Sequence, residues 1–182
     1  MIAMTFGAGC MFRINTRNTG ISSERAVKTA HLRGGINPST AAPDALDNTL
    51  KSVERIALNN GYDSFLMFNV SAQRATRPDD MEQNCNLTLH RKNMKAFDYA
   101  LSLSAQERPA VWAAWGAIIE KRGYLSGCVR DMVELGKKRG AEWFCAGQRS
   151  KAGHPHHTLY LRKDSALKAF DIDGYFGTRL FT

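Results

Sequence analysis

The residue types most suited to chemistry gather in a few short polar segments of the chain. Residues 34–40 read GGINPST, and Asn37 precedes a proline, which favours extended backbone with the asparagine side chain projecting from it. An amide in this position can orient a water molecule or read the edge of a base, although an Asn-Pro-Ser turn can also simply begin a helix. This segment therefore predicts either a catalytic or base-reading asparagine or a structural turn.

A second segment, residues 153–157, reads GHPHH and brings together three of the five histidines. An imidazole can donate a hydrogen bond to an oxyanion, so His154 and His157 suit a loop that contacts phosphate or a base. Three histidines could also bind a metal ion in a metal-dependent hydrolase, with Asp44 or Asp47 as a further ligand. The H-P-H-H pattern lacks helical spacing and a clear fourth ligand, so we expect no metal.

Polar and basic residues near these segments predict an anionic partner. The chain carries a formal net charge of +8, which favours nucleic acid or nucleotides. Arginines that follow a buried strand can bind phosphate, or can belong to a solvated loop. We expect nucleic-acid or phosphate contacts from Ser39, Thr40, Asn69, Arg74, Thr76, Arg149, Lys151 and Tyr160.

The remaining composition is that of an ordinary globular protein. Four cysteines without a C-x-x-C pair predict reduced thiols and no cofactor. With no secretion signal and no apolar run of membrane length, we expect a cytoplasmic monomer with no membrane partner. The 182 residues suit one α/β domain over 1–182, in which 1–29 form an amino-terminal extension and 7–18 could form an edge strand or hairpin.

Elements of alternating type must position the polar segments. Helical spacing is found within residues 43–62, 87–103 and 117–138, and apolar runs predict strands at 30–37, 64–70, 110–115 and 141–147. This alternation predicts a three-layer α/β/α sandwich around a four-stranded, mainly parallel sheet, followed by a tail with one short strand or helix. Trp112 and Trp115 are expected in the core. Each polar segment follows a predicted strand, where ligands bind in such folds, so we expect one common site.

Several of these motifs, in this order, resemble a bacterial and phage family known as domain of unknown function 1643. The similarity covers residues 34–161, and one departure is Thr158, where the family usually has proline. The motifs that carry it are INPSTA (36–41), Asp47-Asn48-Thr49, NVSAQRAT (69–76), the WG at 115–116 and GHPHHTLYL (153–161).

A more distant similarity links the chain to the uracil-DNA glycosylase superfamily. GINPST resembles the GINPG motif of its mismatch-specific uracil/thymine branch, and RATRPDD, AAWG and HPHHTL are similar to three later motifs. The resemblance implies a uracil-DNA glycosylase-like fold in which Asn37 positions the attacking water, while His154, and with it His157, stabilises the departing base. Ser39 replaces the glycine of that branch. The aromatic residue that stacks on the base is left open between Phe68 and Tyr62.

The sequence therefore predicts a glycosylase-like protein that acts on or recognises a base, including a modified one, in DNA or a nucleotide. Hydrolysis of the base–sugar bond requires the nucleotide outside the stack and a stabilised leaving base. The first motif holds no carboxylate, so a group elsewhere in the protein must act as the general base that takes a proton from the attacking water. A nucleotide-binding module without catalysis, and a metal-dependent hydrolase that uses the GHPHH histidines, remain alternatives.

Overall fold

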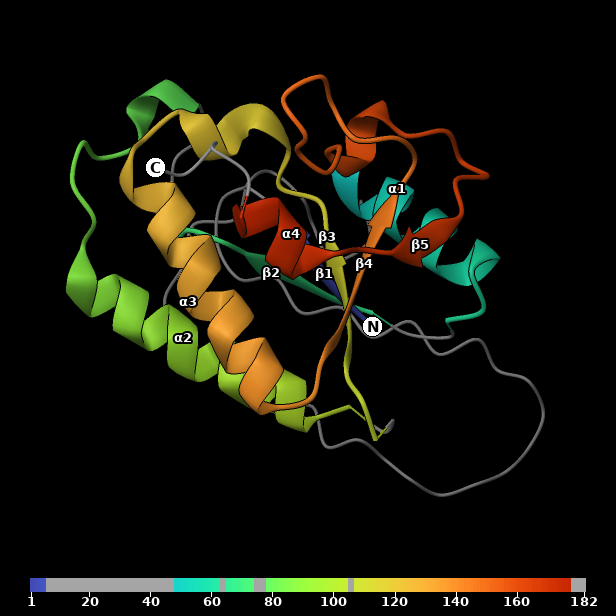
Figure 1. Ribbon diagram of the computed structural model, residues 1–182, viewed down its shortest axis with the longest axis horizontal. Coiled ribbons are helices and arrows are strands. Elements are labelled where there is room, and N and C mark those ends of the chain that lie inside the picture. Colours follow the sequence, from blue (N-terminus) through green and yellow to red (C-terminus); the bar gives the residue numbers. More distant parts are fainter. Residues whose placement is uncertain (6–47, 63–64, 74–77, 105–106, 178–182) are drawn as a thin grey trace.

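The computed structural model describes residues 1–5, 48–62, 65–73, 78–104 and 107–177 (Figure 1). Its centre is a five-stranded sheet in the order β2-β1-β3-β4-β5, in which the first four strands run parallel and β5 runs antiparallel to β4. The strands are β1 (Ile2–Thr5), β2 (Leu66–Asn69), β3 (Ala110–Ala113), β4 (Glu142–Ala146) and β5 (Leu167–Ala169). The helices are α1 (Asn48–Asn59), α2 (Leu87–Ser102), α3 (Tyr124–Lys138) and α4 (Ile172–Gly177), with 3₁₀ turns η1 (Pro78–Asp80), η2 (Gly116–Glu120) and η3 (Thr158–Tyr160).

The α/β class and the mainly parallel sheet are confirmed, but the predicted number of four strands is wrong. Three predicted strands appear as β2, β3 and β4, whereas the strand predicted at residues 30–37 and the hairpin at 7–18 lie outside the described residues. The sheet gains β1 and β5, which have four and three residues. Runs this short lie below the length at which alternation can be recognised, so β1 was not predicted, and β5 was expected only as one short strand or helix somewhere in the tail.

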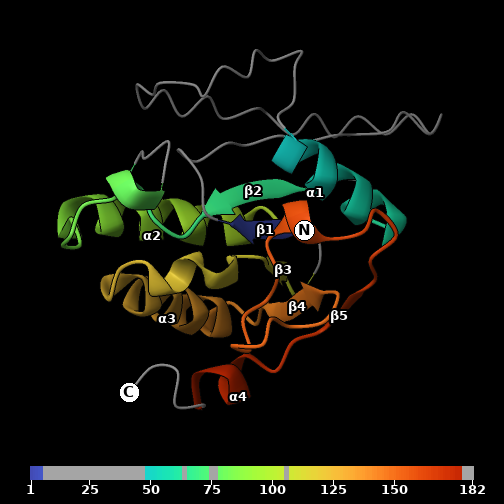
Figure 2. The same cartoon turned by 90° about the horizontal axis from the view of Figure 1, so that it is seen from above.

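Helices cover both faces of the sheet (Figure 2). Alternate residues of β1 point in opposite directions, so Met4 packs in the cluster that holds α2, α3 and α4, whereas Ala3 packs in the cluster beneath α1. Trp112 and Trp115 are fully buried, one in each cluster, which confirms their expected place in the core. None of the described helices is long and apolar enough to cross a membrane.

Local signals explain the two long helices on one face. The Asn86 side chain caps α2 by accepting a hydrogen bond from the Leu89 N–H at 3.1 Å. In α3, the buried residues Leu125, Val129 and Met132 recur at helical spacing. Gly136 of α3 is needed for close packing, because a Cβ there would lie 3.0 Å from the ring of Trp143 in β4.

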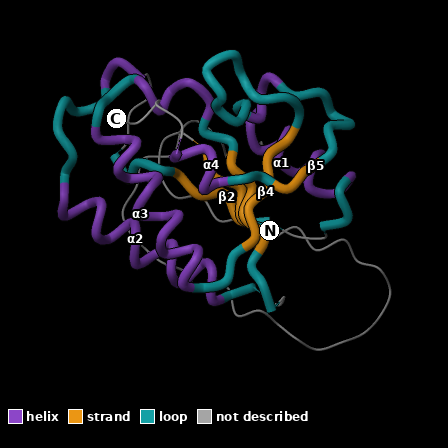
Figure 3. The backbone as a smooth tube through the Cα atoms, viewed as in Figure 1, coloured by secondary structure: helices purple, strands orange, loops and turns teal. Residues whose placement is uncertain are grey.

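Parallel strands place their carboxyl ends at one edge of the sheet. Residues 70–86 follow β2, residues 114–123 follow β3, and residues 147–158 follow β4. The loops after β3 and β4 lie side by side at this edge (Figure 3), where the Gly116 N–H donates to the Pro155 carbonyl at 2.9 Å. We call this region the carboxyl edge.

Candidate functional site

His154 lies at the centre of a series of side-chain hydrogen bonds at the carboxyl edge. Its Nδ1 is 2.7 Å from the hydroxyl of Tyr175, and its Nε2 is 2.8 Å from Oε1 of Glu120. The Trp115 Nε1–H donates to the same hydroxyl at 3.0 Å. We call these four residues the histidine network.

One assignment of protons satisfies every link of the histidine network. The indole N–H of Trp115 can only donate, so the Tyr175 oxygen accepts it. The Tyr175 hydroxyl then donates to Nδ1 of a neutral His154, and the Nε2–H of His154 donates to the Glu120 carboxylate. In this arrangement the imidazole orients the carboxylate, and the buried aromatic residues orient the imidazole.

The histidine network leads from the core to the surface. His154 and Tyr175 are each 1% exposed, whereas the Glu120 side chain is 56% exposed. Burial raises the pKa of the Tyr175 hydroxyl to about 12, against the opposing effect of the Trp115 hydrogen bond, so this hydroxyl keeps its proton at neutral pH. The network therefore presents to solvent a single ionisable group, the Glu120 carboxylate.

A glycine joins the turn after β3 to the histidine loop. Gly116 has a φ of +64°, a left-handed conformation that favours glycine, and a Cβ at this position would lie 3.3 Å from the Cβ of His157. Its N–H donates to the Pro155 carbonyl. This junction fixes η2, which carries Glu120, against the loop that carries His154.

His157 shapes the exposed end of the same loop. It precedes η3, and its Nδ1 accepts a hydrogen bond from the Leu159 N–H at 3.4 Å. Its ring meets the ring of Tyr160 edge to face at 6.3 Å, and Tyr160 is 81% exposed. Ser52 of α1 donates to the Thr158 carbonyl at 2.9 Å and so holds η3 against α1. His157 thus supports an exposed aromatic side chain.

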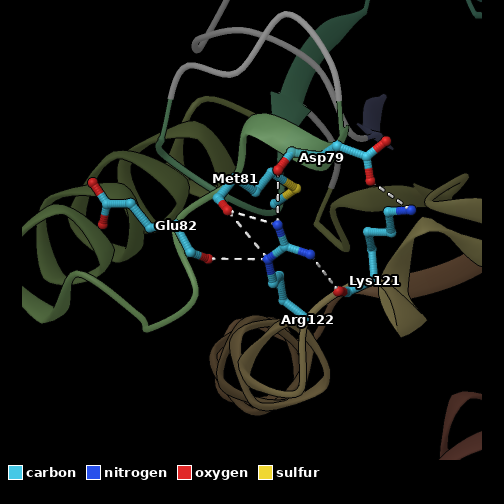
Figure 4. Close-up of polar contacts among 5 residues, drawn as sticks. All are labelled: Asp79, Met81, Glu82, Lys121 and Arg122. Carbon is cyan, nitrogen blue, oxygen red and sulfur yellow. Dashed lines mark hydrogen bonds and ion pairs between the residues drawn. The ribbon is translucent and has the colours of Figure 1, made fainter.

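The loop after β2 is tied to the end of η2 by an arginine (Figure 4). The Arg122 guanidinium donates to the carbonyl oxygens of Asp79, Met81 and Glu82 at 2.8–3.3 Å, and to that of Lys121 at 2.9 Å. We call this set the arginine clamp. The ammonium of Lys121 also pairs with the Asp79 carboxylate at 2.7 Å, and this hydrogen bond lowers the pKa of Asp79.

The structure places only some of the predicted site residues. Arg149 and Lys151 are exposed in the loop before His154, while Asn69 ends β2 in a buried position, where its carbonyl accepts from Asn93 Nδ2 at 3.0 Å. Phe68 is fully buried against Phe97 with ring centroids 5.1 Å apart, so it is not placed to stack on a base. The predicted Asn37, Ser39, Thr40, Arg74 and Thr76, and the aspartates Asp44 and Asp47, lie outside the described residues.

Two residues of the histidine network escaped the sequence analysis. Helical structure was expected over 117–138, with a break near its start at Gly123 or Gly127, and the structure has such a break: η2 ends at Glu120 and α3 begins at Tyr124. Glu120 itself was not singled out. Tyr175 lies in the tail, 21 residues after His154, and no local motif marks it. Within the part of the chain that the structure describes, no group of three or more histidine, cysteine or acidic residues could hold a metal ion.

Fold and site together define an α/β domain with a polar network at the carboxyl edge of a parallel sheet. Residues 25–159 match the family model described as "Protein of unknown function (DUF1643)". This stretch is more than half of the chain, so the protein belongs to that family. It contains Trp115, Glu120 and His154, whereas Tyr175 lies beyond it. No curated protein and no solved structure matches the chain.

Proposed function

We propose that this protein hydrolyses the base–sugar bond of a nucleotide in DNA, including one that carries a modified base. The observation that carries the proposal is the histidine network, because it ends in a solvent-exposed carboxylate held by buried partners. The motif similarity to the uracil-DNA glycosylases supports the same chemistry. The carboxylate that the first motif lacks is supplied by Glu120, from the turn after β3.

The reaction requires a general base that deprotonates the attacking water, and a nucleobase that leaves with the electron pair of the broken bond. Glu120 takes a proton from a water molecule whose oxygen bonds to C1′ of the sugar. The bond between C1′ and the base nitrogen breaks, and its electron pair leaves with the nucleobase. Solvent water then protonates the nucleobase, and Glu120 returns its proton to solvent. Both ring nitrogens of His154 already have protein partners, so His154 is a positioning residue that orients the Glu120 carboxylate.

Charged and aromatic groups around the network suit a nucleic-acid substrate. Arg149 and Lys151 are exposed in the loop after β4 and can neutralise phosphates. Tyr160 is exposed at the end of the same loop, where its ring can stack on an unpaired base. Asn37, Ser39 and Thr40 remain candidates to contact water or the base.

A matched pair of carboxylate variants tests the proposal. The full chain is incubated with duplexes that carry uracil, mismatched thymine or modified bases, and abasic sites are revealed by alkaline strand cleavage. We expect product with the wild type, and a rate lowered by about 10²–10⁴-fold in Glu120→Gln, because the amide cannot take a proton from water. Glu134→Gln, at a carboxylate of similar exposure on α3, should leave the rate unchanged. If no duplex yields an abasic product, or if Glu120→Gln reacts as fast as the wild type, the proposed function is rejected.

A module that recognises a nucleotide without breaking a bond is the second candidate. It is favoured by the burial of His154 and His157, which leaves Arg149, Lys151 and Tyr160 as the exposed charged and aromatic side chains of the loop. Saturable DNA binding without turnover would support it. Affinity should then fall steeply with salt concentration, because phosphate contacts release counterions.

A further inference from the structure

Two free cysteines from different elements meet beside the loop that follows β2. Cys85 directly precedes Asn86, the capping residue of α2, and Cys128 lies in α3. Their sulfur atoms are 4.0 Å apart. A disulfide has an S–S length of about 2.05 Å, so the two sulfur atoms must approach by about 2 Å to form one.

The two thiols differ in their access to solvent. Cys85 is half-buried, and it lines a small surface cavity to which Cys128, Ser71 and Tyr124 also contribute. Cys128 is 5% exposed, and burial, together with the neighbouring Cys85, raises the pKa of its thiol to about 12. A reagent from solvent therefore reaches Cys85 first, and Cys128 is placed to react with whatever forms on Cys85.

We propose that Cys85 and Cys128 form a reversible intramolecular disulfide when the protein meets a hydroperoxide. The Cys85 sulfur attacks the peroxide oxygen, which gives a sulfenic acid on Cys85 and releases an alcohol or water. The Cys128 sulfur then attacks the Cys85 sulfur, the S–O bond breaks, and the hydroxyl leaves as water with the proton of the Cys128 thiol. Two thiols are oxidised by two electrons in total, and the peroxide is reduced.

The bond would join parts of the fold that now touch without a covalent link. It would tie the amino end of α2 to α3, and Cys85 lies three residues after Glu82, whose carbonyl belongs to the arginine clamp. Oxidation would therefore hold the loop after β2 in place next to η2. A cross-link that spans residues 85–128 also restricts the unfolded chain, so it should stabilise the fold. This inference does not depend on the proposed function.

Peptide mapping of the full chain tests the proposal directly. The protein is treated with hydrogen peroxide at low excess, remaining thiols are alkylated, and peptides are separated without reductant. We expect one peptide pair that joins Cys85 to Cys128, the loss of two hydrogens in the intact mass, and full reversal by dithiothreitol. The oxidised protein should also melt several degrees higher than the reduced protein.

Variants at the cysteines make the outcome specific. Cys85→Ser should abolish the intramolecular bond, whereas Cys145→Ser, at a buried cysteine of β4, and Cys10→Ser should retain it. The mapping of the wild type decides the question even if a variant folds poorly. A bond that involves Cys10 or Cys145, bonds only between molecules, or over-oxidation of Cys85 without a partner would overturn the proposal.

Discussion

The histidine network and the arginine clamp both join neighbouring loops at the carboxyl edge, but they use different chemistry. The clamp satisfies backbone carbonyl oxygens with one guanidinium, and these oxygens only accept hydrogen bonds. The network passes through three buried side chains and ends at the exposed carboxylate of Glu120. The comparison separates a contact that maintains shape from one that can transfer a proton, and it predicts that changes in the two regions affect different measurements.

The largest effect is expected from His154→Phe, which removes the group that orients Glu120. We expect base release to slow by about 10²-fold or more, because a carboxylate without its partner no longer holds its orientation. The free energy of unfolding should also fall by about 1–3 kcal/mol, since buried polar groups lose a hydrogen-bond partner. Single-turnover kinetics and urea unfolding check the two effects. His156→Asn, a change in the same loop outside the network, should alter neither.

Arg122→Lys should have the opposite profile. An ammonium cannot contact four carbonyl oxygens in the geometry of the guanidinium, so the free energy of unfolding should fall by about 1–3 kcal/mol. The rate per folded molecule should stay within about twofold of the wild type, because no group of the histidine network changes. Arg91→Lys, at an exposed arginine of α2, is the control. If Arg122→Lys loses most of its rate of base release while its stability is unchanged, the arginine clamp and the histidine network do not differ in the way proposed.

Gly116→Ala tests the junction that brings Glu120 and His154 together. The positive φ of Gly116 should cost about 1–2 kcal/mol for alanine, and the new methyl group must also displace His157. Thermal unfolding should show this loss, and Gly127→Ala in α3, which has open space around it and an ordinary backbone, should show none. Equal stability of Gly116→Ala and the wild type would contradict the observed packing.

The smallest effect is expected from Tyr175→Phe. The free energy of unfolding should fall by about 1 kcal/mol at neutral pH, and the difference from the wild type should depend on pH. The folded protein keeps the Tyr175 proton up to about pH 12, whereas the unfolded chain loses it near its ordinary pKa of 10. The free energy of unfolding of the wild type should therefore fall between these pH values, and Tyr175→Phe should remove that part of the decrease. Urea unfolding at several alkaline pH values measures this decrease, and Tyr160→Phe, at an exposed tyrosine, is the control. If the free energy of unfolding falls with pH in the same way for all three proteins, the buried hydroxyl does not contribute.

The sequence predicted the regular part of the fold and singled out one residue of the histidine network, His154. Long periodic segments identified α2 and α3, and unbroken apolar runs identified β2, β3 and β4, because burial imposes those patterns. The short β1 could not be predicted, since four residues are too few to show an alternation of apolar and polar side chains. The meeting of the WG turn with the histidine loop followed from parallel strands, whose carboxyl ends share one edge.

Glu120 and Tyr175 could not be predicted for a different reason. Their contacts with His154 span 34 and 21 residues, and a single sequence holds no signal that joins residues so far apart. Glu120 also sits in a 3₁₀ turn rather than in the expected helix, so its direction depends on how η2 packs. Tertiary packing alone converts a common surface glutamate into the end of a buried network.

The most direct test compares base release by Glu120→Gln and Arg122→Lys at a temperature where both variants are fully folded. If the histidine network performs the chemistry, the glutamine variant leaves glycosidic bonds intact while the lysine variant still generates abasic sites. If Glu120→Gln releases bases as fast as the wild type, the carboxylate has no role in the reaction and the central claim fails.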